Sequence, residues 1–241
     1  MMEKNKTEET YQRFAVLHRL LHVVVISSFI ILSITGFALA FSHQGWAKIL
    51  VFLMGGADNA GGLHRFFAAF FYLGVMVHLL WLMYFKLVLN GKLTGPDSMF
   101  PQVQDFKDLY QNFRYIFGKG APPLFNRFSY LEKIDYWAVM GGMQSMGITG
   151  LIMWHPEFFS QYLPGYFINI ANDFHFHEAV LAVAYIGFVH MSAAHLVPDV
   201  FPMEKSIFTG QTSREKLMHD HPGEWQRMQA AVKQPVAGED S

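Results

Sequence analysis

Residues 175–198 read HFHEAVLAVAYIGFVHMSAAHLVP, a stretch in which histidines flank an almost unbroken apolar run. The run at residues 179–189 predicts a helix that crosses a lipid bilayer. His175 and His190 lie fifteen residues apart, which is about 22 Å along a helix, on faces roughly 60° apart. Ionisable groups at membrane depth are costly and usually functional, so one face of this helix can bind a group at two depths. The alternative is a helix with a histidine at each water-exposed end.

The composition is that of a membrane protein. Of the 241 residues, 52% are apolar and only 15% are charged, against about 25% in soluble domains. The net charge of −1 suggests no nucleic-acid partner. The chain contains no cysteine, which excludes disulfides, iron–sulfur clusters, thiolate metal sites and covalent haem attachment. Any metal must therefore be bound by imidazole or carboxylate groups.

Four apolar runs, each close to the roughly 20 residues that span a bilayer, predict an all-α, integral membrane four-helix bundle. We expect helices at about residues 20–41, 63–89, 134–154 and 175–197, within a single domain covering residues 1–241. Residues 42–63 are expected to form a Gly-rich loop. Residues 90–133 are a polar loop whose amphipathic segment, 105–117, is expected to lie as a surface helix on the membrane.

Lysine and arginine indicate the orientation of the bundle. They concentrate in residues 4–19, in the loop 90–133 and after residue 204, whereas residues 155–174 contain neither. Because cytoplasmic loops carry the excess of these residues, the N-terminus, the middle loop and the C-terminus are predicted to be cytoplasmic.

This orientation sorts four histidines by depth. His22 and His190 are expected at the inner level, and His64 and His175 at the outer level. Six-coordinate haem iron needs an axial ligand on each face of the ring, and imidazole is its usual protein ligand. Two imidazole pairs, each contributed by two helices, therefore predict two b-type haems.

Three further histidines compete with this assignment or extend it. His78 lies roughly 40° off the face of His64 and reaches the inner level; it either replaces His22 or is a hydrogen-bonded core residue. His177 lies about 140° from His190 on a helical wheel, so it suits the site less well than His175. His195 lies about one turn beyond His190, where it can bind a propionate or a quinone, or face lipid headgroups.

A weak internal repeat links the first and third runs. Ile34-Thr35-Gly36 and Ile148-Thr149-Gly150 occupy their outer thirds. Small residues allow the close approach either of a flat ring or of a neighbouring helix, and the sequence leaves both interpretations open.

The chain resembles the membrane cytochrome b (gamma) subunits of respiratory formate dehydrogenases and nickel–iron hydrogenases. The resemblance covers most of residues 13–228 and depends on the order of several motifs. They are His22 followed by Gly36, Leu63-His64-Arg65-Phe66-Phe67, the run 137–154, Trp154-His155-Pro156, Gln161-Tyr162-Leu163-Pro164, and His-Pro-x-x-Trp at 221–225. A narrower likeness at residues 175–203 is to b-type cytochromes associated with multihaem c-type cytochromes in anaerobic respiration.

The resemblance implies the same ligand pairs, His22 with His190 and His64 with His175, and a menaquinone-type site beside the inner haem. In formate dehydrogenase subunits, a Tyr-Asn-x-x-Gln-Lys segment before the third helix helps to bind the quinone. Here the segment reads Phe-Ser-Tyr-Leu-Glu-Lys, so Ser129 and Glu132 replace the Asn and the Gln. They can still bind a quinone and carry its proton, or they can simply begin the helix, with Ser129 as its cap.

The sequence therefore predicts a diheme subunit of a membrane oxidoreductase complex in the bacterial inner membrane. It would carry electrons between a periplasmic or membrane-attached redox partner and the quinone pool. A dehydrogenase partner would make it a quinone reductase; a terminal reductase or multihaem cytochrome c would make it a quinol oxidase. One alternative is a histidine-based metal transporter, which would need carboxylates among the helices. Another is a membrane di-iron oxygenase, which would cluster its histidines at one depth.

Overall fold

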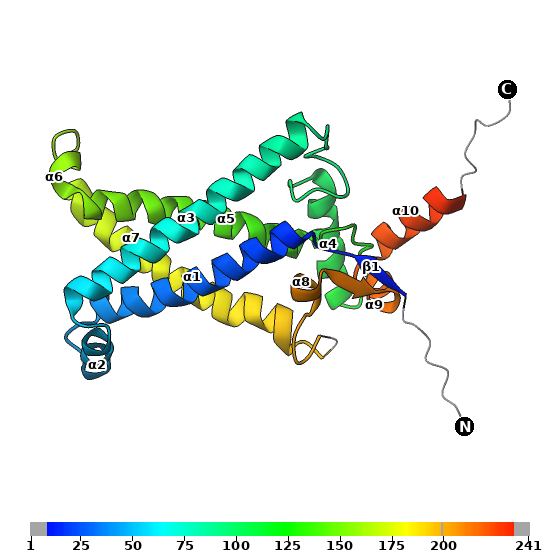
Figure 1. Ribbon diagram of the computed structural model, residues 1–241. Helices are drawn as coiled ribbons and strands as arrows, with labels where there is room; N and C mark the ends of the chain where they lie inside the picture. The colour runs from blue at the N-terminus through cyan, green and yellow to red at the C-terminus, as the bar shows by residue number, and fades with distance from the viewer. Residues whose placement is uncertain (1–8, 199, 234–241) are drawn as a thin grey trace. The chain divides into compact units, whose positions relative to one another are not determined.

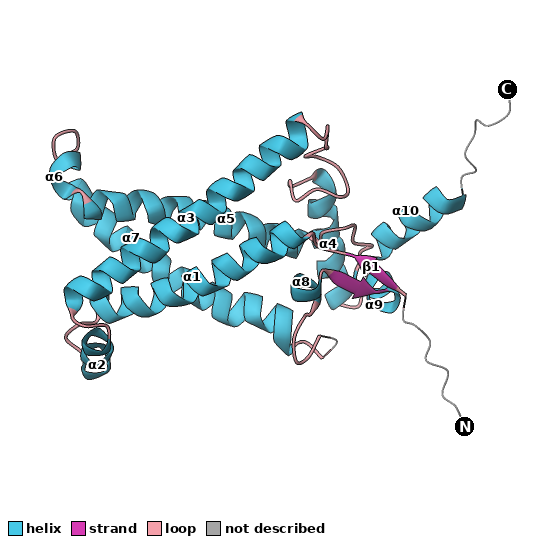
Figure 2. Ribbon diagram, viewed as in Figure 1, coloured by secondary structure: helices cyan, strands magenta, loops and turns pink. Residues whose placement is uncertain are grey.

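The computed structural model describes residues 9–198 and 200–233, and these residues are mostly helical (Figure 2). The two termini, which the sequence predicts to be cytoplasmic, therefore lie partly outside the described residues, at 1–8 and 234–241. In chain order the elements are β1 (Thr10–Gln12), α1 (Val16–Ala40), α2 (Gly45–Leu53), α3 (Ala57–Leu87), α4 (Val103–Ile116), α5 (Tyr130–Trp154), α6 (Pro156–Phe159), α7 (Tyr166–Tyr185), the π-helical segments η1 (Ile186–His190) and η2 (Ser192–Leu196), α8 (Ser206–Thr209), β2 (Gln211–Ser213), α9 (Arg214–Asp220) and α10 (Pro222–Lys233).

Three of the described helices are long and apolar enough to cross a membrane: α1, α3, and the helix that runs through α7, η1 and η2. Large apolar side chains such as Leu20, Leu73 and Leu181 are about 60% exposed on them. An apolar surface of this extent requires an apolar environment, which lipid provides. The remaining predicted span, α5, has the same 25-residue length as α1. It is not among the helices that are both long and apolar enough to cross a membrane, so its crossing stays a prediction.

The chain divides into two compact units, and two of the boundaries between them fall within α3 and α5. We call residues 15–83 and 138–204 the helical unit, and the described parts of 9–14, 84–137 and 205–233 the polar unit.

In the helical unit, α1, α3, α7 and the second part of α5 are long rods that pass one another (Figure 1). The side chains buried along α1 are small: Ser28, Thr35 and Ala38. Small residues let helix backbones approach closely in a membrane. At one such crossing the Tyr72 hydroxyl donates a 2.5 Å hydrogen bond to the carbonyl of Met143.

The polar unit is built from short elements joined by charged pairs. β1 pairs with β2 in antiparallel register. The ammonium of Lys133, in the first turn of α5, bonds Asp105 of α4 at 2.7 Å. Of the two, Lys133 is only 5% exposed, so this pair joins α4 to α5 away from water. The predicted surface helix at 105–117 is confirmed as a helix, α4; its position on a membrane stays a prediction.

The predicted loop at 42–63 was wrong, and the segment 155–174 between the third and fourth predicted helices is also partly helical. Residues 42–63 contain α2 and the start of α3, and residues 155–174 contain α6 and the start of α7. Hydropathy ends a run where polar residues begin, but a helix continues as long as its backbone bonds are made. Asp58 lies in the first turn of α3, where a negative charge favours a helix N-terminus. As a result His64 and His175 lie inside their helices, whereas the sequence predicted them at helix starts.

Candidate functional site

The structure brings together two pairs of histidines in the helical unit. The ring centroids of His22 on α1 and His190 at the end of η1 are 6.5 Å apart. Those of His64 on α3 and His175 on α7 are 6.3 Å apart. These are the pairs that sorting by depth predicted.

The two pairs lie at different levels along the same helices. His22 and Thr35 are thirteen residues apart on α1, and Thr35 contacts His64 of the second pair. At 1.5 Å per residue, the levels are about 20 Å apart along that helix. Among the described residues, no three or more His, Asp or Glu side chains gather into a metal-binding group. The site is thus two separate imidazole pairs.

The spacing within each pair fits a metal held between two imidazoles. A metal–nitrogen bond is about 2.0–2.1 Å, and a ring centre lies about 1.15 Å from its nitrogens, so two coordinating rings have centres about 6.3–6.5 Å apart. Both observed spacings agree with this value. A planar porphyrin with iron at its centre is the group that takes two such axial ligands, and the chain contains no cysteine to attach it covalently.

In the pair of His64 and His175, each histidine ring lies against a Thr-Gly pair of a neighbouring helix. The Thr35 hydroxyl is 2.9 Å from Nδ1 of His64, and the Thr149 hydroxyl is 3.0 Å from Nδ1 of His175. A methyl group on the adjacent Gly36 would lie 3.2 Å from Cε1 of His64. The repeat seen in the sequence therefore makes two equivalent contacts with histidine rings. The sequence did not predict which side chains the repeat would contact.

The other candidate histidines are not members of these pairs. His78 stacks on Trp81 at 6.5 Å and lies 6.1 Å from His18, between ring centroids. Nδ1 of His177 bonds the carbonyl of Asp173 at 2.7 Å. His195 lies in η2, half-buried, five residues beyond His190.

The wide turns of η1 end at His190, and those of η2 include His195. π-Helical turns often mark functional sites, yet no sequence signal predicted them. Because a π-helical turn contains more residues than an α-helical turn, the rotation between His175 and His190 differs from that of the continuous α-helix predicted from the sequence.

Ser129 and Glu132 form a capping box at the start of α5. The Glu132 carboxylate accepts hydrogen bonds from the backbone N–H and the hydroxyl of Ser129, at 2.7 and 2.9 Å. The same carboxylate pairs with Arg13 at 3.3 Å. This is the helix-start arrangement weighed as the alternative to a quinone site.

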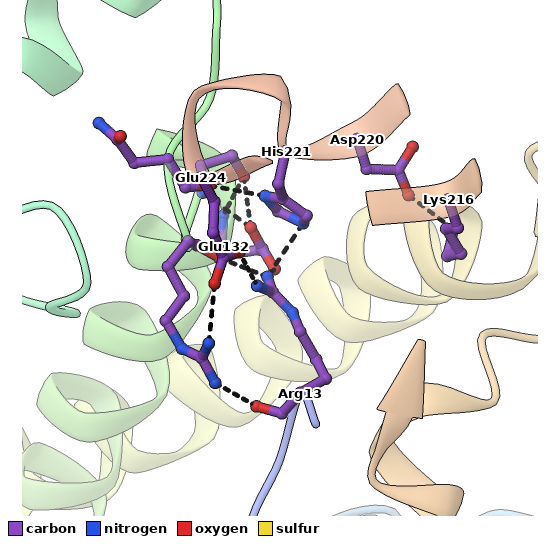
Figure 3. Close-up of polar contacts among 9 residues, drawn as sticks. Arg13, Glu132, Lys216, Asp220, His221 and Glu224 are labelled. Carbon is purple, nitrogen blue, oxygen red and sulfur yellow. Dashed lines mark hydrogen bonds and ion pairs between the residues drawn. The ribbon is translucent and has the colours of Figure 1, made fainter. Parts of the chain in front are cut away.

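Arg13 is the centre of a buried polar cluster in the polar unit (Figure 3). Its guanidinium bonds Glu224 at 3.0 Å, the carbonyl of Arg127, and Nε2 of His221 at 2.9 Å. Arg13 and Glu224 are only 5% and 6% exposed. Nδ1 of His221 lies 2.7 Å from the carbonyl of Asn126, to which it donates. Burial, and then the charge of Arg13, lower the pKa of His221, so His221 is neutral and accepts from Arg13.

Residues 13–209 match the family profile described as prokaryotic cytochrome b561. The fold and the match define a membrane b-type cytochrome that takes part in electron transfer. Since the matched region covers most of the chain, the protein belongs to the prokaryotic cytochrome b561 family, whose members bind haem b. No curated protein sequence matches the chain.

Proposed function

We propose that this protein is a diheme membrane cytochrome b that passes electrons between a periplasmic redox partner and the quinone pool. The observation that carries the proposal is the presence of two imidazole pairs, with ring centroids 6.3 and 6.5 Å apart, at two levels of one set of helices. We assign His64 and His175 to an outer haem, and His22 and His190 to an inner haem.

The chain's own residues would position the haems and tune them, and the bound haems would supply one-electron chemistry. His22 with His190, and His64 with His175, would each hold one haem, which would then transfer single electrons rather than bind an exogenous ligand. Bis-imidazole coordination therefore supports electron transfer as the role of both levels.

We assign the quinone site to the neighbourhood of the inner pair, with His195 as its candidate proton-carrying group. An imidazole can hydrogen-bond a quinone carbonyl and exchange the proton that accompanies its reduction. Ser129 and Glu132, candidates from the resemblance, already bond each other, and Glu132 also pairs with Arg13. These contacts favour a capping role for both residues.

We further propose that α5 is the fourth span and that both termini and the loop 90–133 are cytoplasmic in a bacterial inner membrane. The distribution of lysine and arginine supports this orientation. The outer pair would then face a partner subunit such as a dehydrogenase, a reductase or a multihaem cytochrome c.

Purified protein should contain two haems per chain, with the absorption bands of reduced b-type haem. The variants His64→Ala and His190→Ala should each retain about one haem, because each removes one axial ligand of a different pair. His177→Ala is the matched control and should retain both, since its ring bonds a backbone carbonyl of its own helix.

A wild-type haem content of one or none would contradict the proposal. So would the loss of the same haem in both histidine variants, as judged by the spectrum of the haem that remains.

A further inference from the structure

Each histidine of the outer pair has a contact of the same kind with a threonine hydroxyl. Thr35 of α1 approaches Nδ1 of His64 at 2.9 Å, and Thr149 of α5 approaches Nδ1 of His175 at 3.0 Å. Thr35 is 1% exposed, so water does not compete for its hydroxyl. The two contacts thus involve four different helices, each of which contributes one residue.

Counting hydrogens indicates which atom donates. A threonine hydroxyl has one hydrogen and two acceptor positions. The hydroxyl of Thr35 lies 2.7 Å from the carbonyl of Ile31, and that of Thr149 lies 2.8 Å from the carbonyl of Ser145. Carbonyl oxygens only accept, and both distances are typical of an O–H···O bond. Each hydroxyl therefore donates back along its own helix.

With its hydrogen used in this way, each hydroxyl can only accept from the imidazole. Nδ1 of His64 and of His175 then carries the ring hydrogen, and a neutral imidazole protonated at Nδ1 has its lone pair at Nε2. The opposite tautomer would break the hydroxyl–carbonyl bond in both helices. The same geometry occurs independently at both histidines, which favours the tautomer that carries the hydrogen at Nδ1.

We propose that Thr35 and Thr149 are positioning residues that set the tautomer and the ring orientation of the two outer histidines. They leave Nε2 as the coordinating atom of each ring. This inference rests on the proposed function, in which His64 and His175 bind the outer haem.

The contact should also tune the outer haem. An acceptor on Nδ1–H makes an imidazole a stronger electron donor to its metal, and losing such a partner typically costs roughly 10–100-fold in metal affinity or activity. Replacing either threonine with valine, which keeps the shape but not the hydroxyl, should therefore raise the midpoint potential of one haem and leave the other unchanged.

The test compares Thr35→Val, Thr149→Val and the double variant with the corresponding serine variants, which restore a hydroxyl. Ser33→Ala and Ser145→Ala are matched controls, because their hydroxyls also bond carbonyls of their own helices. For each purified protein, the haem content, the low-spin electron paramagnetic resonance signals and the two midpoint potentials are measured.

The proposal expects that each valine substitution shifts the signal and raises the potential of one and the same haem. Serine should restore both, and the two controls should match the wild type. If valine causes loss of one haem, retention of that haem in the serine variants supports the proposal, and loss in both refutes it.

Unchanged signals and potentials in the valine variants, beside a wild type with two haems, would refute the positioning role and leave the proposed function intact. Equal shifts in the valine and serine variants would refute it as well, since the hydroxyl would then not be the cause. A wild type without two haems would instead refute the proposed function itself.

Discussion

Gly36 and Gly150 set how closely α1 and α5 approach the outer histidines. A methyl group on Gly150 would lie 3.4 Å from Cε1 of His175, an ordinary contact. A methyl group on Gly36 would lie 3.2 Å from Cε1 of His64, which is tighter than the ring tolerates without moving. The two glycines are therefore equivalent in position but unequal in the space they leave.

We expect Gly36→Ala to disturb the haem proposed to bind His64, because the new methyl group must displace the imidazole. Elsewhere in a helix, glycine to alanine gains up to about 1 kcal/mol from backbone entropy. Gly141→Ala, with nothing within 4 Å of the added atom, is the control that should show this gain. Thermal unfolding and electron paramagnetic resonance measure both effects. An unaltered haem signal in Gly36→Ala would contradict the expectation.

At the scale of residues, the sequence predicted the two histidine pairs but not their contacts. The pairs followed from depth, since a helix of known rise places each histidine at a computable level. The contact of Thr35 with His64 depends on how two helices are rotated about their axes, which the sequence of one helix does not specify. The repeated Ile-Thr-Gly triplet indicated a close approach at this position in both helices, but it did not show which side chain would make the approach.

At the scale of elements, α10 is held to the rest of the polar unit through Arg13, His221 and Glu224. Residue 13 precedes α1, whereas His221 and Glu224 belong to the C-terminal part of the chain. Removing one partner of a buried charged pair leaves the other charge uncompensated. The cluster therefore makes the packing of α10 depend on the protonation of His221.

Lowering the pH should weaken this packing. Burial and Arg13 hold the pKa of His221 below its usual value in the folded protein, so below about pH 6.5 the unfolded chain binds the proton first. The free energy of unfolding therefore falls as the pH drops from about 6.5 through the folded-state pKa, and is unaffected by this group above that range.

Limited proteolysis of residues 205–233 at pH 5.5 and pH 7.5 measures this effect. The wild type should be cleaved faster at the lower pH, relative to a His221→Gln variant treated in parallel, because glutamine does not titrate. An identical pH response in the two proteins would exclude His221 as the cause.

Hydropathy was sufficient for the long helices and insufficient for their ends. The runs at 20–41, 63–89 and 134–154 are confirmed as helices α1, α3 and α5, and the fourth run is confirmed as the helix of α7 to η2. The fourth helix begins at residue 166 rather than 175, and the second at 57 rather than 63. Polar first turns carry no hydropathy signal, and the π-helical turns depend on packing that a single segment does not encode.

At the scale of the whole molecule, the absence of cysteine permits a direct test of orientation. A single cysteine at Gln44, which is exposed just before α2, should react in intact cells with a membrane-impermeant maleimide. A single cysteine at Lys119, exposed in the loop after α4, should react only after the cells are lysed. The reverse pattern would invert the proposed topology, and reaction of both in intact cells would exclude a cytoplasmic middle loop.

With a haem at each histidine level, as proposed, the separation between the levels would make electron transfer through the protein sensitive to the membrane potential. The separation of about 20 Å is two-thirds of the roughly 30 Å hydrocarbon thickness. The free energy of one elementary charge changes by about 2.3 kcal/mol when it crosses the whole membrane at 100 mV. One electron moving between the levels thus gains or loses about 1.5 kcal/mol, close to a tenfold change in its distribution. In an energised cell, the membrane potential would therefore partly set the fraction of time that an electron spends on each proposed haem.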